Sequence, residues 1–340
     1  MPNQTDSTSA FFQARDRGCE YLLAHLRPDG GAGAAHRGVA DYYKVASALQ
    51  VCGENRAANR LCQWIRRHGI TPDGDFGPRP LEASGYYYAY YNSWVILGAH
   101  RLGQYDLSQR GMDFLMRFHD PVTGGFYSSA TERTPETLQD IWVVSGCGQA
   151  ALMTGRIEPA RAVGRWMREV MRQQPEFPKR LYGVFSRANG LETHFDPAAA
   201  VRYVSSQDAQ CDQFVFNPGI SAGFLCRLYQ ATREIEWLEL AKQFMVFAEG
   251  MNDFLVRLLR SGKVGWASSV LYTLTGEEKY RQLAMRVGNS LVESQKLDGT
   301  WNLGDFFPEE AALDIAAEMV VWLDEICQAV GSERVAGQAT

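Results

Sequence analysis

The sequence predicts an all-α protein in which six helical hairpins close into a ring, an (α/α)6 toroid. Two observations lead to this fold class. Along the chain, helical patterns with a charged face alternate with helical patterns that are apolar nearly all round. In addition, one spacing of residues recurs at intervals of roughly 50 residues, which is typical of an array of similar units.

Each predicted hairpin consists of an outer helix and the inner helix that follows it. In the first outer helix, Phe11, Cys19 and Leu22 lie on one side at helical spacing, and the turn Pro28-Asp29-Gly30-Gly31 ends it. The later outer helices repeat this pattern of one apolar and one charged face. We predict outer helices over 11–26, 56–68, 107–118, 158–173, 235–250 and 278–295.

The inner helices are predicted from their apolar composition, because a helix without a charged face must be covered on all sides. Small residues such as Gly146, Gly148 and Gly223 would let these helices approach one another closely. We predict an inner ring of six apolar helices over 40–52, 90–103, 139–154, 217–231, 263–275 and 310–328.

Composition favours one large folded unit. The 340 residues are 46% apolar and 21% charged, which is enough for a sizeable core. We predict a single toroid domain over 10–328, with flexible termini at 1–9 and 331–340. The segment 175–212 interrupts the repeat with an irregular run that contains Pro and Phe, and we expect it to form an ordered lid.

Charge and cysteine usage argue against several classes of function. The net charge is −5 and no basic stripe is present, so nucleic acid is not expected as a partner. No apolar run is long enough to span a membrane, and the first ten residues carry no secretory signal. Seven scattered cysteines without CxxC favour a reducing compartment, and we expect a cytoplasmic protein.

The recurring spacing starts with a basic residue, followed four residues later by an aromatic residue or its replacement and then by an aliphatic one. Eight or nine residues later comes a turn of three residues that begins with Gly. Its third residue is large in three copies and small in one. The four copies are Arg17-Gly18-x-x-Tyr21-Leu22 to Gly30-x-Ala32, Arg60-x-x-x-Trp64-Ile65 to Gly74-x-Phe76, Arg110-Gly111-x-x-Phe114-Leu115 to Gly124-x-Phe126, and Arg286-x-x-x-Ser290-Leu291-x-x-x-Gln295 to Gly299-x-Trp301.

This spacing resembles the QW motif of the α/α-toroid superfamily of terpenoid cyclases and protein prenyltransferases. The family motif has a basic residue, Gly, an aromatic and an aliphatic residue, and then Gln before Gly-x-Trp. The copy from Arg286 through Gln295 to Trp301 is the most complete, with Val287 and Ser290 in place of the family's Gly and aromatic residue. The resemblance implies the same toroid architecture that the helical pattern predicts.

The catalytic motifs of that superfamily are not found in this sequence. Neither Asp-x-Asp-Asp nor Asp-Asp-x-x-Asp occurs, and the nearest pair, Asp73-Gly74-Asp75, lies on a predicted outer turn. The zinc ligands of the prenyltransferases would have only Cys211, Asp212 and His194 as counterparts. We therefore expect one metal-independent toroid that uses no cofactor.

In a ring of hairpins, the inner helices all begin at one end of the axis. Free N–H groups and the positive ends of the helix dipoles then face the mouth of the central cavity, so we expect the functional site there. Polar and aromatic residues gather near these predicted helix starts: Asp41, Tyr42, Tyr43 and Lys44; Tyr90, Tyr91, Asn92 and Trp94; Asp140 and Trp142; Gln213 and Asn217; Lys263 and Trp266; Glu310 and Asp314.

Asp41 and Asp140 take matching places before two of the inner helices. One hypothesis makes them a pair of catalytic carboxylates across the cavity, one a general acid and the other a general base. Burial and the helix terminus would separate their pKa values. The alternative is that each caps its helix and stabilises it by about 1 kcal/mol.

The run from Ser84 to Asn92 contains five tyrosines, which cannot all lie on one side of a helix. Some are expected to face the cavity, with Tyr91 as a catalytic phenol, and the alternative is ordinary core packing. Aromatic faces in the cavity would stabilise a cation by about 0.5–2 kcal/mol each. The predicted substrate-binding residues are His36, Tyr43, Tyr87, Tyr90, Asn92, Trp94, Trp142, Asn217 and Trp266.

Two histidines complete the predicted site. His194 lies between Glu192 and Asp196 in the irregular segment and is predicted to act as a catalytic base or proton shuttle. His36 precedes the first inner helix and is expected at the cavity mouth. For both histidines the alternative is an exposed loop position without a catalytic role.

Three functions remain open at this point. The first is a cyclase, isomerase or lyase of secondary metabolism that uses acid–base catalysis on a small, largely apolar substrate. The second is a carbohydrate-active (α/α)6 enzyme, such as a glycan lyase or an unsaturated glucuronyl hydrolase, with Tyr91, Asn92 and His194 as its reactive residues. The third is a non-catalytic toroid that binds a partner chain.

Overall fold

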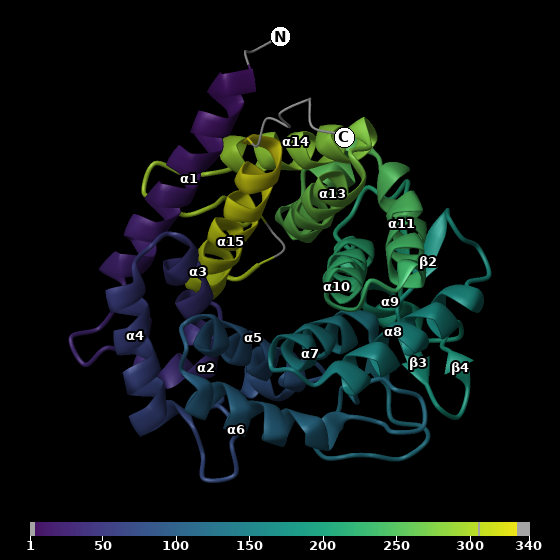
Figure 1. Ribbon diagram of the computed structural model, residues 1–340, viewed down its shortest axis with the longest axis horizontal. Coiled ribbons are helices and arrows are strands. Elements are labelled where there is room, and N and C mark those ends of the chain that lie inside the picture. Colours follow the sequence, from purple (N-terminus) through teal and green to yellow (C-terminus); the bar gives the residue numbers. More distant parts are fainter. Residues whose placement is uncertain (1–3, 305–306, 332–340) are drawn as a thin grey trace.

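Two concentric layers of helices make up the protein, as a computed structural model shows for residues 4–304 and 307–331 (Figure 1). The predicted (α/α)6 toroid is thereby confirmed. The inner layer consists of α3 (Val45–Val51), α5 (Tyr88–Arg101), α7 (Ile141–Met153), α10 (Asn217–Thr232), α13 (Gly262–Thr275) and α15 (Ala312–Gly331). The outer layer consists of α1 (Gln4–Ala24), α4 (Asn55–Trp64), α6 (Tyr105–Leu115), α8 (Ile157–Arg172), α11 (Ile235–Glu249) and α14 (Glu278–Glu293).

The ring closes because the last hairpin packs against the first. Each inner helix contacts the next one, and α15 contacts both α3 and α1 (Figure 1). Small residues permit this close packing, as the sequence indicated. A Cβ atom on Gly223 of α10 would lie 2.2 Å from the ring of Trp266 on α13, so a larger residue there would push the two helices apart.

The first inner helix differs from its prediction as one continuous helix over 40–52. It is divided into α2 (Val39–Tyr42) and α3, with a turn at Tyr43 and Lys44 between them. Both side chains at this turn line the central cavity. At this turn the ammonium group of Lys44 is held by carboxylates of α15.

The four copies of the recurring motif form the same turn. An isolated antiparallel bridge closes each one, at Leu26–Ala32, Ile70–Phe76, His119–Phe126 and Gln295–Trp301. The motif glycines all have positive φ, a region that side chains with a Cβ atom rarely adopt. The φ values are 94° at Gly30, 98° at Gly74, 86° at Gly124 and 87° at Gly299.

These turns also join neighbouring hairpins. A Cβ atom on Gly74 would lie 2.4 Å from the carbonyl oxygen of Arg110, the basic residue that opens the next copy of the motif. At the ring closure, a Cβ atom on Gly299 would lie 2.3 Å from the carbonyl oxygen of Arg17. Gln295 accepts a hydrogen bond from Arg17 at 2.7 Å and donates one to the carbonyl of Ala14 at 2.8 Å. The motif thus links each turn to the following outer helix.

The segment 175–212 contains short strands, which the sequence did not predict. Strands β2 (Arg180–Tyr182) and β5 (Val204–Ser206) pair antiparallel, with α9 (Ala200–Tyr203) before β5. Strands β1 (Gln139–Asp140), β3 (Val184–Ser186) and β4 (Gly190–Leu191) form a second antiparallel sheet in the order β1-β3-β4. The role of the segment 175–212 as a lid stays a prediction.

The other short elements connect the helices. The first outer helix begins at Gln4 rather than at residue 11, while 1–3 and 332–340 of the predicted flexible termini lie outside the described residues. No helix in the described ranges is long and apolar enough to cross a membrane. The connecting elements are η1 (Ala35–Arg37), η2 (Ile65–Gly69), η3 (Leu81–Ser84), η4 (Met116–Phe118), η5 (Pro197–Ala199), α12 (Asp253–Val256), η6 (Leu259–Ser261) and η7 (Glu309–Ala311).

Candidate functional site

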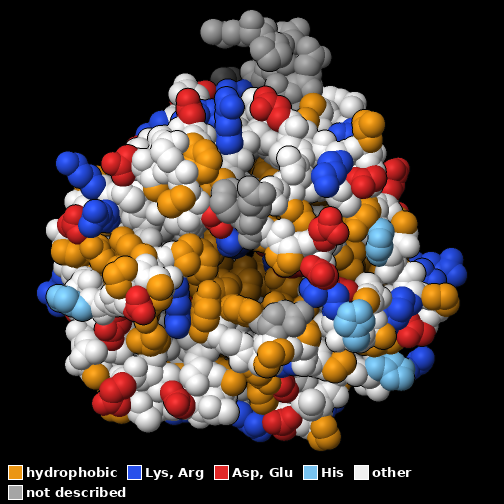
Figure 2. All heavy atoms as spheres, turned by 180° about the vertical axis from the view of Figure 1, so that it is seen from behind, with side chains coloured by type: hydrophobic (Ala, Val, Ile, Leu, Met, Phe, Trp, Pro, Cys, Tyr) orange, Lys and Arg blue, Asp and Glu red, His pale blue; other side chains and the backbone are white. Residues whose placement is uncertain are grey.

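A cavity of about 510 Å³ lies on the axis of the ring, at the end where the inner helices begin. Figure 2 shows this face of the molecule, hollowed at its centre and lined there by hydrophobic side chains. The position agrees with the expected site. The lining residues are Arg37, Ala40, Tyr43, Lys44, Tyr86, Tyr87, Tyr90, Tyr91, Trp142, Val201, Asp212, Phe214, Phe216, Leu259, Arg260, Lys263, Phe307, Pro308, Ala311, Asp314, Ile315, Glu318 and Met319.

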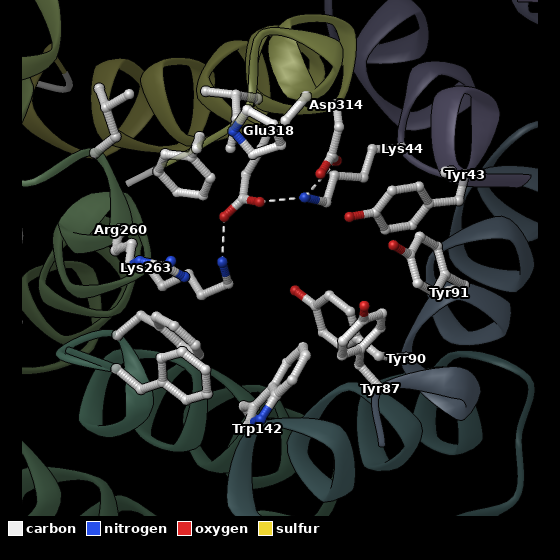
Figure 3. A pocket seen from close by; sticks show the side chains of 18 of the residues that line it. Tyr43, Lys44, Tyr87, Tyr90, Tyr91, Trp142, Arg260, Lys263, Asp314 and Glu318 are labelled. Atoms are coloured by element: carbon white, nitrogen blue, oxygen red, sulfur yellow. Dashed lines mark hydrogen bonds and ion pairs between the residues drawn. The ribbon is translucent and has the colours of Figure 1, made fainter. Parts of the chain in front are cut away.

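One wall of the cavity carries a buried network of charges around α15 (Figure 3). The carboxylate of Glu318 pairs with the ammonium groups of Lys44 and Lys263, one on each oxygen. Its Oε1 atom also accepts a hydrogen bond from the indole Nε1 of Trp322 at 3.1 Å. Glu318 is therefore held by three donors from three different elements of the inner layer, α15 itself among them.

The charges of this network determine one another's pKa values. Burial opposes the ionisation of Glu318, but Lys263 and Lys44 outweigh it and hold the pKa of Glu318 well below the ordinary value. Burial lowers the pKa of Lys263, with the charge of Lys44 acting in the same direction. For Lys44 burial also acts to lower the pKa, but Asp314 and Glu318 outweigh it and raise the pKa. The central carboxylate is thus stably ionised.

Asp314 is the second carboxyl group of this wall, one helical turn before Glu318 on α15. Its Oδ1 atom lies 2.7 Å from Nζ of Lys44, an ion pair without the geometry of a hydrogen bond. Burial raises the pKa of Asp314, with Lys44 opposing and the nearby Glu318 charge adding to the rise. The side chain keeps 20% of its surface exposed. Burial thus favours the protonated form of Asp314 and the ion pair with Lys44 favours the carboxylate, in a side chain that lines the cavity.

The opposite wall is aromatic and comes from α5, α7 and the segment before α10 (Figure 3). The ring of Trp142 lies 4.6 Å from that of Tyr90 and 5.8 Å from that of Phe216, both in edge-on arrangements. Tyr43 and Tyr91 approach to 4.3 Å at the side. Burial raises the pKa of Tyr90 and Tyr43 well above the ordinary value, so both phenols stay neutral.

Asp41, predicted as a catalytic carboxylate, does not line the cavity. Its Oδ1 accepts a hydrogen bond from Nε of Arg37 at 2.7 Å, and its Oδ2 accepts one from the backbone N–H of Ala34 at 2.8 Å. The side chain thereby positions Arg37, which itself lines the mouth.

Asp140 likewise lies outside the cavity. It is fully buried and accepts two hydrogen bonds from Arg202, at 2.8 Å and 2.6 Å. The structure therefore does not have the predicted pair of carboxylates facing each other across the cavity. Both aspartates are neutralised by arginines, and matching positions before two helices could not reveal these partners.

The predicted histidines also lie elsewhere. His36 and His194 are exposed and do not line the cavity. Their exposure agrees with the alternative interpretation, in which neither histidine belongs to the site. Among the residues that the structure describes, His194 lies at hydrogen-bonding distance, 3.2 Å, from its neighbour Thr193 alone. Cys211 is exposed and Asp212 pairs with Arg260 at 2.9 Å. Within the described ranges, no three His, Cys, Asp or Glu side chains gather in a way that could hold a metal ion.

Five of the predicted residues do line the cavity, namely Tyr43, Tyr87, Tyr90, Tyr91 and Trp142. Apart from His36, the other four substrate-binding predictions, Asn92, Asn217, Trp94 and Trp266, do not line it. Asn92 donates a hydrogen bond to Asp75 at 2.9 Å, and Asn217 is buried against Gly183. Trp94 and Trp266 line a separate hollow of about 30 Å³.

The sequence analysis missed Glu318, which is the centre of the charged wall. A signal for it exists, because Asp314 and Glu318 are charged residues four positions apart among the apolar residues 311–323 of the predicted helix. Buried charges require partners, and Lys44 and Lys263 occur in two other apolar helices. Lys44, Lys263 and Asp314 were recognised only as polar residues near inner-helix starts.

Comparisons with known proteins agree with this fold. A D-mannose isomerase superposes with a TM-score of 0.65 at 11% identity, over 91% of this chain and 96% of its own. An unsaturated glucuronyl hydrolase specific for heparin gives 0.63 at 10% identity, over 96% and 98%. A type II terpene cyclase from Scytonema, in complex with its product merosterolic acid A, gives 0.61 at 11% identity, over 96% and 99%.

No protein-family model and no curated protein matches the sequence. The structural matches include both a terpene cyclase and (α/α)6 enzymes of sugars, so the resemblance to the α/α-toroid superfamily is confirmed at the level of the fold. At such low sequence identities the shared fold does not choose between these chemistries.

Proposed function

We propose that the protein is an enzyme that isomerises or cyclises a small, largely apolar metabolite by acid–base catalysis. The observation that carries this proposal is Asp314, a partly buried carboxyl group with a raised pKa that faces a cavity walled by aromatic rings. A proton donor on one side and π faces on the other suit a reaction through a carbocation. The cavity volume of about 510 Å³ lies within the usual range for small-molecule sites.

In this reaction, protonated Asp314 donates its proton to a carbon of a substrate double bond, which leaves a carbocation. The faces of Trp142, Tyr87 and Tyr90 stabilise the positive charge while the bond shifts or a ring closes. A neighbouring C–H group then returns a proton to the Asp314 carboxylate. The product is an isomer of the substrate, and the acid is regenerated without any other reagent.

The remaining charges hold the acid in place. Lys44 contacts both Asp314 and Glu318, and Lys263 contacts the other oxygen of Glu318. Because Glu318 is already satisfied by three donors, it is a weak proton acceptor and leaves proton transfer to Asp314. We assign Glu318 and Lys263 positioning roles.

The test combines a substrate panel with two matched variants of α15. Linear isoprenoid alcohols such as geraniol, farnesol and geranylgeraniol are incubated with the protein, and the products are analysed by mass spectrometry. Asp314→Asn should lower turnover about 10²- to 10⁴-fold, the usual contribution of a general acid. Asp324→Asn is the control, because Asp324 likewise has a raised pKa but is buried and pairs with Arg15 away from the cavity.

The pH dependence follows from the same assignment. The acid must be protonated, so turnover should fall as pH rises through the pKa of Asp314, which lies above the ordinary aspartate value. If the variant Asp314→Asn turns over substrate as fast as wild type, Asp314 is not the general acid and the proposed mechanism is wrong. A wild-type protein that binds an isoprenoid and converts none would favour the non-catalytic alternative.

A carbohydrate-active enzyme is the second candidate. It is favoured by two arginines at the cavity mouth, Arg37 and Arg260, since guanidinium groups suit the carboxylate of a uronic acid. Aromatic rings such as Trp142 would stack on sugar rings in the same cavity. Both arginines are already paired, with Asp41 and Asp212, so we place this function second. Loss of the absorbance of unsaturated uronic disaccharides on incubation would reverse that order.

A further inference from the structure

A second hollow of about 500 Å³ lies beside the central cavity, and none of the chemistry above uses it. It is an open groove between the start of α5 and the connection that leads to α7. Tyr86 belongs to the lining of both hollows, so they share one wall. The lining residues are Ser84, Gly85, Tyr86, Ser128, Ser129, Ala130, Thr131, Glu132, Glu136, Thr137, Leu138 and Arg202.

Tyr86 has a different neighbour on each side. Toward the cavity, its ring meets Trp142 edge-on at 6.3 Å. Toward the groove, the guanidinium of Arg202 lies 4.1 Å from the centre of the Tyr86 ring. Asp140 holds that guanidinium with two hydrogen bonds, which gives this buried carboxylate a positioning role at the junction. A ligand long enough to pass Tyr86 would occupy both hollows.

The groove is rich in hydroxyl groups and ordered by backbone contacts. Ser128 accepts a hydrogen bond from the N–H of Asp140 at 2.9 Å, which leaves its hydroxyl hydrogen able to donate to a ligand. Arg133 donates to the carbonyl of Ser129 at 2.8 Å and to that of Ala130 at 3.3 Å, so it fixes the shape of this wall. A preformed polar surface of this kind loses little entropy on binding.

The charges of the groove indicate which ligand it suits. Glu132 and Glu136 are exposed at its edge, and no Lys, Arg or His forms an ion pair with either within residues 4–304 and 307–331. The only cation of the lining, Arg202, is neutralised by Asp140. An anion such as a phosphate would therefore meet two carboxylates without a free cation. Hydroxyl groups of a ligand, in contrast, can donate to carboxylates and to serine oxygens.

We propose that the groove binds an uncharged, hydroxyl-rich head group, such as a sugar, of a substrate whose apolar body lies in the central cavity. The substrate class is then an amphiphile, for example a glycosylated isoprenoid. This inference rests on the proposed function for the placement of the apolar body. It extends that function by assigning a separate binding site to the polar end.

Binding can be measured without turnover, by titration calorimetry of the full chain with geranyl β-D-glucoside, geraniol and geranyl phosphate. The variant Thr131→Trp fills the groove, because Thr131 is exposed in its lining and lies away from the cavity. The matched control is Val122→Trp, which adds the same side chain to the same connection at a residue that is 70% exposed and does not line the groove.

Wild type should bind the glucoside about tenfold more tightly than geraniol, and Thr131→Trp should remove that advantage while Val122→Trp keeps it. Affinity for geraniol should be the same in all three proteins. The inference is overturned if Thr131→Trp leaves the glucoside affinity unchanged, or if wild type binds geranyl phosphate more tightly than the glucoside. It is also overturned if wild type binds neither the glucoside nor geraniol. Failure of the proposed acid would appear separately, as unchanged turnover in Asp314→Asn.

Discussion

The two walls of the central cavity differ in how their side chains are held. On the side of α15, Asp314, Glu318 and two lysines form one connected network of buried charges (Figure 3). On the side of α5 and α7, neutral rings meet in pairs, such as Trp142 with Tyr90 at 4.6 Å. Charges buried together depend on all their partners, whereas ring contacts add smaller separate contributions.

This difference predicts two kinds of mutational response. Removing Glu318, the centre of the α15 wall, changes the pKa values of the other charges and leaves two buried lysines without their shared carboxylate. Removing one ring from the aromatic wall should reduce the rate in a graded way and leave the fold largely intact. The wall of charges therefore determines whether the site exists, and the wall of rings determines how well it works.

The largest effect is expected for Glu318→Gln, which leaves Lys44 and Lys263 buried without their shared carboxylate. We expect a loss of about 3–5 kcal/mol in the free energy of unfolding, measured by urea denaturation. Glu325→Gln on the same helix is the control. Its partner Arg227 is partly exposed, so a loss below about 1 kcal/mol is expected there.

The same variant should change the response to acid. Because the folded-state pKa of Glu318 is depressed, its contribution to stability is present above the ordinary glutamate pKa and is lost as pH falls toward the folded value. Wild type should thus lose stability on acidification more steeply than Glu318→Gln. Equal slopes, or equal stability of the two proteins at neutral pH, would contradict the described network.

A smaller effect is expected for Trp142→Leu on the aromatic wall. Losing one π face that stabilises a cation by about 0.5–2 kcal/mol should lower turnover about 2- to 30-fold. Trp142→Phe retains a π face and should lose less. If both variants turn over an isoprenoid as wild type does, the aromatic wall does not stabilise a cation.

The smallest effect on the rate is expected for Lys44→Met, whose main consequence is a shift of the pH profile. The charge of Lys44 opposes the rise in the pKa of Asp314, so its removal should raise that pKa further. The alkaline limb of turnover should therefore move to higher pH. Lys242→Met on the outer helix α11 is the control, and an equal shift in both variants would refute the coupling.

Particular residues show how far sequence reasoning could reach. The motif glycines were identified from spacing alone, because a turn that needs positive φ keeps its glycine in every copy. The tyrosine run placed Tyr87, Tyr90 and Tyr91 in the cavity for a similarly local reason, since a helix cannot turn five side chains to one face.

Other predicted residues failed for lack of partner information. Asp41 and Asp140 had the residue type and position of catalytic carboxylates, but arginines from the short elements η1 and α9 pair with them. The pairing of Asp140 with Arg202 joins residues that are 62 positions apart, through a segment that the helical repeat does not cover. No periodic pattern indicates a contact of that kind.

The sequence by itself determined the ring, because helical periodicity and the recurring glycine turns are local properties that each hairpin carries alone. Only the tertiary structure decided where the chemistry lies. Lys44 and Glu318 are 274 residues apart, and Lys263 and Glu318 are 55 apart, yet closure of the ring brings all three together. A buried charge acquires its pKa and its role from such partners, so the site exists only once the ring has closed.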